Sequence, residues 1–371
     1  MEKIGLIQVL RAYAALWVVW RHTYYQGFEV GVFGVDVFFV ISGFIMAYIC
    51  AEQAVAPGRF LLRRTLRIAP LYWLVTCAAF GLALLAPHLF NSTTGNWSNL
   101  LKSLLFIPYL KENGTVMPVI PVGWTLNCEM LFYLAMSACL GFGRKHAALA
   151  AAAGLAMLPV VVRADLADSP AAWFYSQPVM AEFLFGVLAF MAWSRLRKLE
   201  LWVPVLAVTA ALSALSLPIL EWQRGAATAF AGRLFLFGVP AATLVLSAAL
   251  LDGRCCAVAA LKNRVALILG DASYSIYLSH IFVIEGLRKV VFPRTGLFDM
   301  TTFAGAFAAL TTAALVGVVI HRLVERPLMG LRSYCNGLPG TPPLASGHAA
   351  GDVVVTVDVS DQSGASRQHG G

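Results

Sequence analysis

The segment GVFGVDVFFVISGFIMAYIC (residues 31–50) contains 20 residues, and Asp36 is the only charged one. A helix that crosses a membrane needs about 20 mostly apolar residues, so this segment predicts a transmembrane span. The rest of the chain has the same character. Of its 371 residues, 59% are hydrophobic and 12% are charged, about half the charged fraction of a typical soluble domain.

The same criterion gives ten candidate spans, and we therefore expect an all-α, polytopic integral membrane bundle of about ten transmembrane helices, with nine or eleven as alternatives. The spans are 6–24, 31–50, 68–90, 122–142, 147–162, 179–194, 201–220, 229–251, 270–292 and 301–323. Residues 1–332 would form one transmembrane domain. Residues 333–371, rich in Gly, Ser, Ala and Pro, would form a disordered cytoplasmic tail.

The loop charges predict the orientation. Of the 27 Lys and Arg residues, 17 fall on one side of the expected bundle and five on the other. Because cytoplasmic loops carry an excess of Lys and Arg, we expect both termini in the cytoplasm. This distribution also accounts for the net charge of +8. No basic face with interleaved aromatic residues indicates a nucleic acid partner, and no Cys/His spacing indicates a metal site.

Two polar residues lie on one face of the first span, LRAYAALWVVWRH (residues 10–22). Arg11 and His22 are separated by three helical turns plus about 20°, or about 16 Å along the axis. Because ionisable groups inside a bilayer are costly, this pair indicates a polar passage through the bundle. The alternative is an arginine paired with a neighbouring helix and a histidine at the interface.

Asp36, Arg64 and Arg67 are further candidates. Asp36 could pair with an arginine or with His22, and a structural ion pair is the favoured reading. Arg64 and Arg67, at i and i+3, would lie at the cytoplasmic surface, where guanidinium groups suit phosphate. Simple anchoring by positive charge is the alternative.

Glu129, in GWTLNCEMLFYL (residues 123–134), lies at a depth similar to that of His22. A carboxylate near a histidine can orient it or raise its basicity; a hydrogen bond between packed helices is the alternative. Trp124 and Tyr133 would be pocket walls or part of an aromatic belt.

The segment SYSIYLSH (residues 273–280) places Tyr274, Tyr277 and His280 at i, i+3 and i+6, on one helix face that we expect to turn inward. Tyr277 and His280 are candidates for substrate contact. A histidine satisfied within the core is the more common reading of His280.

In this order, these segments resemble the acyltransferase-3 family of bacterial inner-membrane acyltransferases over about residues 4–330. An Arg/Lys-x10-His motif matches Arg11 and His22, and a GVDxFFxxSG segment matches residues 34–43. An RxxR-like segment before Pro-x-Tyr-Trp matches Arg64, Arg67, Tyr72 and Trp73. A W-[ST]-L-x-x-E-x-x-F-Y pattern matches residues 124–133, and SYSIYLSH and ERP complete the order. The second and fourth segments look most like the exopolysaccharide-production branch.

The resemblance implies transfer of an acyl group, usually acetyl, from cytoplasmic acyl-CoA to a hydroxyl of an exported polysaccharide or glycan. It implies no metal, and it implies contact with the bilayer, the glycan acceptor and polysaccharide synthesis or export machinery. His22 would act as general base or become acylated, and Glu129 would orient it. Arg64 and Arg67 would bind the CoA phosphates and Arg11 would line the route. The other expected substrate contacts are Asp36, Trp124, Tyr133, Tyr277 and His280.

Three other readings stay open at this point. The protein could be a transporter or flippase for a lipid-linked sugar, or a non-enzymatic subunit of polysaccharide export. It could also be an acyltransferase with another donor, such as succinyl-CoA, or a small acceptor.

Overall fold

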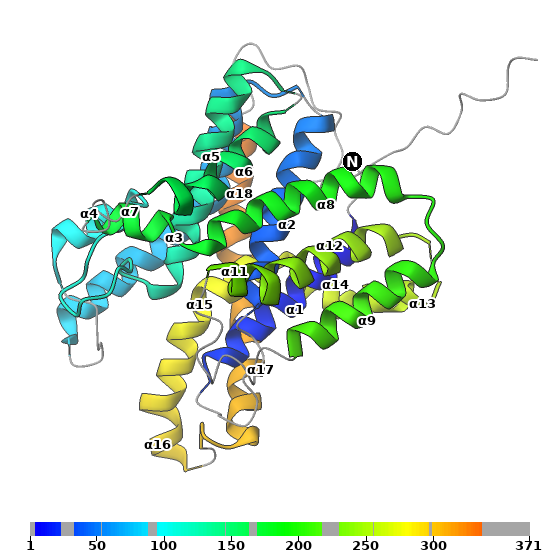
Figure 1. Cartoon of the computed structure of the whole chain (residues 1–371). Helices are drawn as coiled ribbons and strands as arrows, with labels where there is room; N and C mark the ends of the chain where they lie inside the picture. The colour runs from blue at the N-terminus through cyan, green and yellow to red at the C-terminus, as the bar shows by residue number, and fades with distance from the viewer. Residues whose placement is uncertain are drawn as a thin grey trace, which may run out of the picture.

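The computed structural model describes residues 4–23, 33–52, 54–87, 95–144, 146–162, 169–216, 230–254, 256–296 and 299–335. In these ranges the chain is helical and has no strand, apart from an isolated bridge between Leu110 and Val116. This confirms the predicted all-α class (Figure 1). The expected tail lies outside the described residues except for 333–335, which end the last helix.

The longer helices are α1 (Gly5–Arg21), α2 (Gly34–Glu52), α3 (Pro57–Leu85), α5 (Trp124–Phe142), α6 (Ala147–Val161), α8 (Glu182–Leu196), α9 (Trp202–Ser216), α12 (Val239–Leu251), α15 (Ser273–Gly286) and α17 (Phe303–Ile320). The shorter ones are α4 (Trp97–Leu104), α7 (Pro170–Tyr175), α11 (Phe230–Arg233), α13 (Cys256–Ala259), α14 (Arg264–Asp271), α16 (Phe292–Thr295) and α18 (Arg326–Cys335). Three π-helical turns join consecutive helices, at Leu234–Gly238, Leu287–Val291 and His321–Glu325.

Every expected span overlaps a helix, but the count of about ten is not confirmed. Among the described residues, six helices are long and apolar enough to cross a membrane. A seventh is reached if α14 and the helix that follows it, bent by 75° at the break, form one span. The remaining expected spans correspond to α1, α6 and α9, whose 17, 15 and 15 residues are short for a bilayer of ordinary thickness. The protein is therefore a helical membrane protein with at least six candidate spans.

The third helix begins earlier than the sequence predicts. The expected span starts at residue 68, because four arginines lower the hydropathy before it, whereas α3 begins at Pro57 and contains 29 residues. Proline is favoured at the first helical position, where its missing N–H costs nothing. Arg64 and Arg67 therefore lie about two and three turns inside α3, and not at a helix start as expected.

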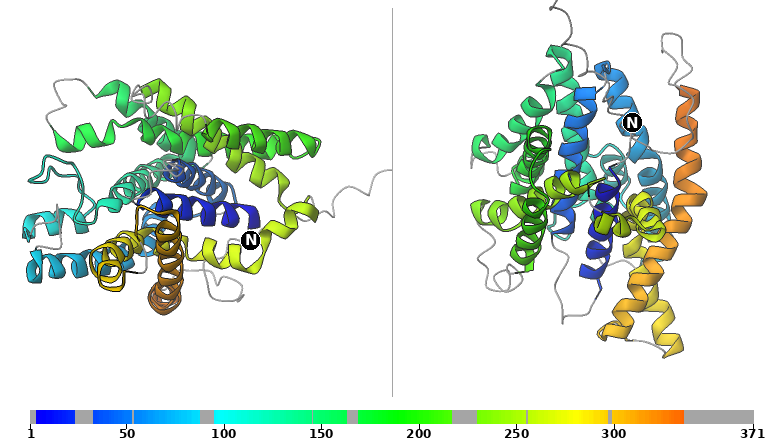
Figure 2. Two further views of the ribbon diagram at one scale, coloured as in Figure 1. Left: turned by 90° about the horizontal axis from the view of Figure 1, so that it is seen from below. Right: turned by 90° about the vertical axis from the view of Figure 1, so that its right-hand side faces the viewer.

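Helix α1 lies in the middle of the bundle, where it packs against α2, α12, α14, α15 and α17 (Figure 2). Its sequence allows this position, because Ala12, Ala14 and Ala15 are at most 2% exposed and small side chains let neighbouring backbones approach. The helix that carries Arg11 and His22 is thus surrounded by protein along most of its length.

Helices α2 and α8 approach each other closely through two glycines. A Cβ atom added to Gly43 would overlap the carbonyl group of Phe183, and one added to Gly186 would overlap the carbonyl oxygen of Val40. Gly43 and Gly186 therefore allow the two helices to approach closely. This contact fixes how α2 sits beside α8.

Substitution of Gly186 by Leu should destabilise the protein by about 1–3 kcal/mol or more, because overpacking forces the two backbones apart. The midpoint of thermal unfolding in detergent, followed by size-exclusion chromatography, measures the effect. Gly154→Leu on α6 is the matched control, because nothing lies within 4 Å of its added Cβ. Equal midpoints for the two variants would contradict the prediction.

Candidate active site

A cavity lies between α1, α2, α3, α5 and α15, and four charged residues line it: Arg11, Arg64, Arg67 and Glu129. Three cations against one carboxylate give the lining a net positive charge, which favours an anionic ligand. Apolar and aromatic side chains form most of the remaining wall. Six of the ten predicted site residues share this cavity: Arg11, Arg64, Arg67, Glu129, Tyr133 and Tyr277.

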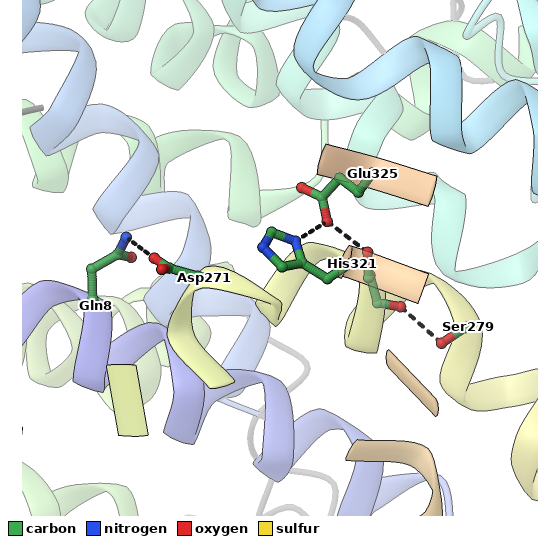
Figure 3. Close-up of polar contacts among 6 residues, drawn as sticks. Gln8, Asp271, Ser279, His321 and Glu325 are labelled. Carbon is green, nitrogen blue, oxygen red and sulfur yellow. Dashed lines mark hydrogen bonds and ion pairs between the residues drawn. The ribbon is translucent and has the colours of Figure 1, made fainter. Parts of the chain in front are cut away.

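Arg11 is held by a chain of hydrogen bonds at one end of the cavity. Its Nη1 donates to Oε1 of Gln8 at 3.2 Å, and Nε2 of Gln8 donates to Oδ1 of Asp271 at 3.0 Å (Figure 3). The backbone of Gln8 also lies so close to Gly270 that a Cβ added to Gly270 would overlap it. Helices α1 and α14 therefore set the direction of the Arg11 side chain together.

Arg64 keeps a buried donor without a protein partner. Its guanidinium carbon lies 5.8 Å from the ring centroid of Phe60, and its Nε makes no hydrogen bond to any described group. A buried unsatisfied N–H is costly. Arg64 also lines the cavity, so its guanidinium group can meet a ligand there.

The sequence led us to expect a contact between Glu129 and His22, but the structure shows none. Its Oε1 accepts hydrogen bonds from the hydroxyl of Tyr133 and, at 3.2 Å, from that of Ser42. The face of α5 that carries Glu129 is turned toward α2 and α3. The carboxylate therefore lies in the cavity, away from the C-terminal end of α1. Glu129 therefore shapes the arginine-rich part of the site and does not orient His22 in this structure.

His22 instead contacts His280. The Nδ1 atom of His22 lies 2.8 Å from the carbonyl oxygen of Val18 and 3.3 Å from Nε2 of His280, and the ring centroids are 4.9 Å apart. His22 caps the C-terminal end of α1 and is exposed, whereas His280 is fully buried on α15. We expected His280 to contact substrate, but it does not line the cavity. Its contact with the site is through His22.

Tyr277 joins the cavity to the histidine pair. Its ring lines the cavity, and its hydroxyl contacts the carbonyl oxygen of Val122 at 3.1 Å and Oγ1 of Thr125 at 2.9 Å. Its backbone carbonyl accepts a hydrogen bond from Nδ1 of His280 at 2.6 Å. One turn of α15 thus separates the arginine-lined space from the exposed His22.

Asp36 and Trp124 lie outside the cavity lining, contrary to expectation. Asp36 is fully buried and pairs with Arg233, whose Nη2 is 2.6 Å from Oδ1; Oε1 of the buried Glu182 is 3.8 Å from the same nitrogen. Trp124 packs against Phe39, with ring centroids 6.1 Å apart. The structural ion pair that the sequence favoured for Asp36 is the observed arrangement.

A second polar cluster lies where α17 continues into α18. Oε2 of Glu325 accepts hydrogen bonds from Nδ1 of His321 at 2.8 Å and from the hydroxyl of Ser275 at 2.6 Å (Figure 3). The π-helical turn His321–Glu325 brings the two side chains together. Glu325 therefore ties α15 to the end of α17.

Gln8, Glu182 and Arg233 were not singled out from the sequence, and the contact of Ser42 with Glu129 was not expected either. Glu182 and Arg233 fall inside expected spans, so the high cost of an intramembrane charge was a signal that could have found them. Gln8 and Ser42 carry no charge and fit ordinary helix packing. Only the three-dimensional arrangement shows that they hold Arg11 and Glu129.

The apolar helices, the cationic cavity inside them and the exposed histidine supported by a second histidine define a class: an integral membrane protein with a site suited to group transfer. The comparison with protein families agrees, because an acyltransferase domain matches residues 4–322. The chain belongs to the acyltransferase-3 family and is a membrane acyltransferase.

Two curated proteins are similar over most of the chain. The exopolysaccharide production protein ExoZ of Rhizobium meliloti (strain 1021) is 37% identical over 313 residues, covering 81% of this chain and 90% of ExoZ. The acyltransferase MdmB of Streptomyces mycarofaciens is 28% identical over 328 residues, covering 81% of each chain. No solved structure matches the chain at a significant level.

Replacement of Arg233 by Met should destabilise the protein by about 3–5 kcal/mol, because two buried carboxylates, Asp36 and Glu182, would lose their cation. Thermal unfolding in detergent measures the loss. The double variant Arg233→Met with Asp36→Asn should recover part of it, since one of the two carboxylates is gone. A double variant no more stable than the single one would show that the charge interaction does not cause the loss.

Proposed function

We propose that this membrane acyltransferase is an O-acetyltransferase that moves an acetyl group from cytoplasmic acetyl-CoA to a hydroxyl of an exported exopolysaccharide. The observation that carries the proposal is the position of an arginine-lined cavity next to the exposed His22 and its buried partner His280, with Tyr277 between the cavity and the two histidines. The donor would thus approach from the cavity and the acceptor from the exposed side of His22, with one turn of α15 between the two routes.

The cavity suits the donor. Coenzyme A carries phosphate groups, and guanidinium groups bind phosphate through charge-assisted, often bidentate hydrogen bonds. Arg64, with its unpartnered buried Nε, and the neighbouring Arg67 would hold the phosphates. Arg11 and the apolar wall would then border the long pantetheine arm.

His22 suits the reacting end. As a general base it would take the proton of the acceptor hydroxyl while the hydroxyl oxygen attacks the thioester carbonyl carbon. The C–S bond then breaks, and the thiolate of CoA leaves and takes up a proton. In the alternative course, His22 first attacks the same carbon, is acylated, and passes the acyl group to the hydroxyl. Glu129 would act in the donor cavity in either course.

The acceptor class rests on similarity, because a 37% identical relative is an exopolysaccharide production protein. Polysaccharide synthesis or export machinery would supply the glycan. The distribution of Lys and Arg supports about ten spans and both termini in the cytoplasm, and membership of the family supports a location in the bacterial inner membrane. His22 would then face outward, where the polymer is exported.

His22→Ala should abolish ester formation, because the reacting nitrogen is lost, while the protein is still made and inserted. The test compares extracellular glycan from wild-type, deletion and His22→Ala strains by NMR for ester-linked acetyl groups. Esters that persist in the variant would contradict the role of His22. Loss of the glycan itself in the deletion strain would favour a transport or assembly function.

Arg64→Ala should raise the KM for acetyl-CoA by about tenfold or more, the size expected for one charge-assisted hydrogen bond, and should change kcat less. Release of CoA by the purified protein gives both constants. Arg59→Ala removes an exposed arginine of the same helix that does not line the cavity, so its KM should stay within about twofold of wild type. An equal rise in both variants would indicate a general charge effect.

A further inference from the structure

We propose that His280 is a positioning residue for His22: together with the backbone carbonyl of Val18, it holds the hydrogen of the His22 ring on Nδ1 and leaves Nε2 as the reacting atom. This inference rests on the proposed role of His22 in acyl transfer. It assigns to His280 an action through His22 and no contact with substrate.

The contact of His22 with its own helix decides its tautomer. A carbonyl oxygen accepts hydrogen bonds and cannot donate them, and that of Val18 lies 2.8 Å from Nδ1 of His22. Two lone pairs at this distance would repel each other, so Nδ1 must carry the hydrogen. In the neutral ring, Nε2 then holds the free lone pair.

The same reasoning fixes the tautomer of His280. Its Nδ1 lies 2.6 Å from the carbonyl oxygen of Tyr277 and therefore carries a hydrogen. His280 is fully buried, and a buried charge is costly, so the neutral ring is favoured and its Nε2 holds a lone pair. This lone pair lies 3.3 Å from the N–H of His22.

The two rings are thus complementary as donor and acceptor. The Nδ1–H of His22 is shared between the carbonyl of Val18 and the Nε2 of His280, which holds the ring on two sides. The ring of His22 is exposed, and no described group forms a hydrogen bond to its Nε2. Nε2 is therefore free to receive a hydroxyl proton or to attack a thioester.

His280 would also act during the reaction. When Nε2 of His22 takes up a proton or an acyl group, the ring becomes cationic and its Nδ1–H becomes a stronger donor. The hydrogen bond to Nε2 of His280 then strengthens. Such an interaction stabilises the transition state more than the ground state, and it raises kcat with little effect on donor binding.

The test is CoA release from acetyl-CoA by purified wild-type protein, His280→Phe and His280→Gln. Phe removes the acceptor and should lower kcat at least about tenfold, the order that one hydrogen bond to a charged group confers. The KM for acetyl-CoA should stay within about twofold. Gln keeps an acceptor oxygen in the side chain and should recover part of the loss. His146→Phe, at an exposed histidine outside the site, should match wild type.

A merely structural His280 would give a different pattern, with Gln no better than Phe, or with KM and kcat falling together with thermal stability. Either result would overturn the inference, as would wild-type kcat in His280→Phe. His280→Leu is a second variant without an acceptor, used if His280→Phe does not fold. His22→Ala separates the two proposals: full activity in that variant, or no CoA release by wild type, would overturn the proposed function as well.

Discussion

The cost of placing a charge inside an apolar bundle is the constraint on which the rest of this structure depends. Each charged group there needs a partner or a ligand. Asp36 and Glu182 share Arg233, and Glu129 accepts hydrogen bonds from Tyr133 and Ser42. These pairs tie together helices that are distant in sequence. Among the described residues, Nε of Arg64 is one of several buried polar atoms without a protein hydrogen bond, and Arg64 lines the cavity.

Backbone proximity makes these pairs possible. Gly43 and Gly186 bring α2 against α8, and Gly270 brings α14 against α1. The first contact brings Asp36 and Glu182 together, and the second brings Asp271 to the side chain that holds Arg11. Small residues therefore determine where the polar ones meet, which explains why a bundle with so few charges has a defined polar interior.

The class of the fold and the helix positions could be read from the sequence, because apolar length is a local property. The cavity residues Arg11, Arg64 and Arg67 could be found too, since a charge in an apolar run stands out on its own. The sequence predicts the start of α3 too late. The arginines lower the hydropathy and so suggest a loop, although the backbone there is already helical. The predicted partner of His22, Glu129, was wrong for a different reason. The packing of α1 against α15, which no local sequence pattern specifies, brings His280 and not Glu129 to His22.

Arg11 lies in helix α1 and His22 is the residue that caps its C-terminal end, and protein surrounds this helix on several sides. A helix resists compression along its axis, so the spacing between the two side chains is a fixed length of about 16 Å. Under the proposed function, helix α1 would therefore set the distance between the donor site and the acceptor site. A shift of α1 along its axis would move both ends by the same amount and in the same direction. The position of Arg11 therefore cannot change along this axis without an equal change in the position of His22.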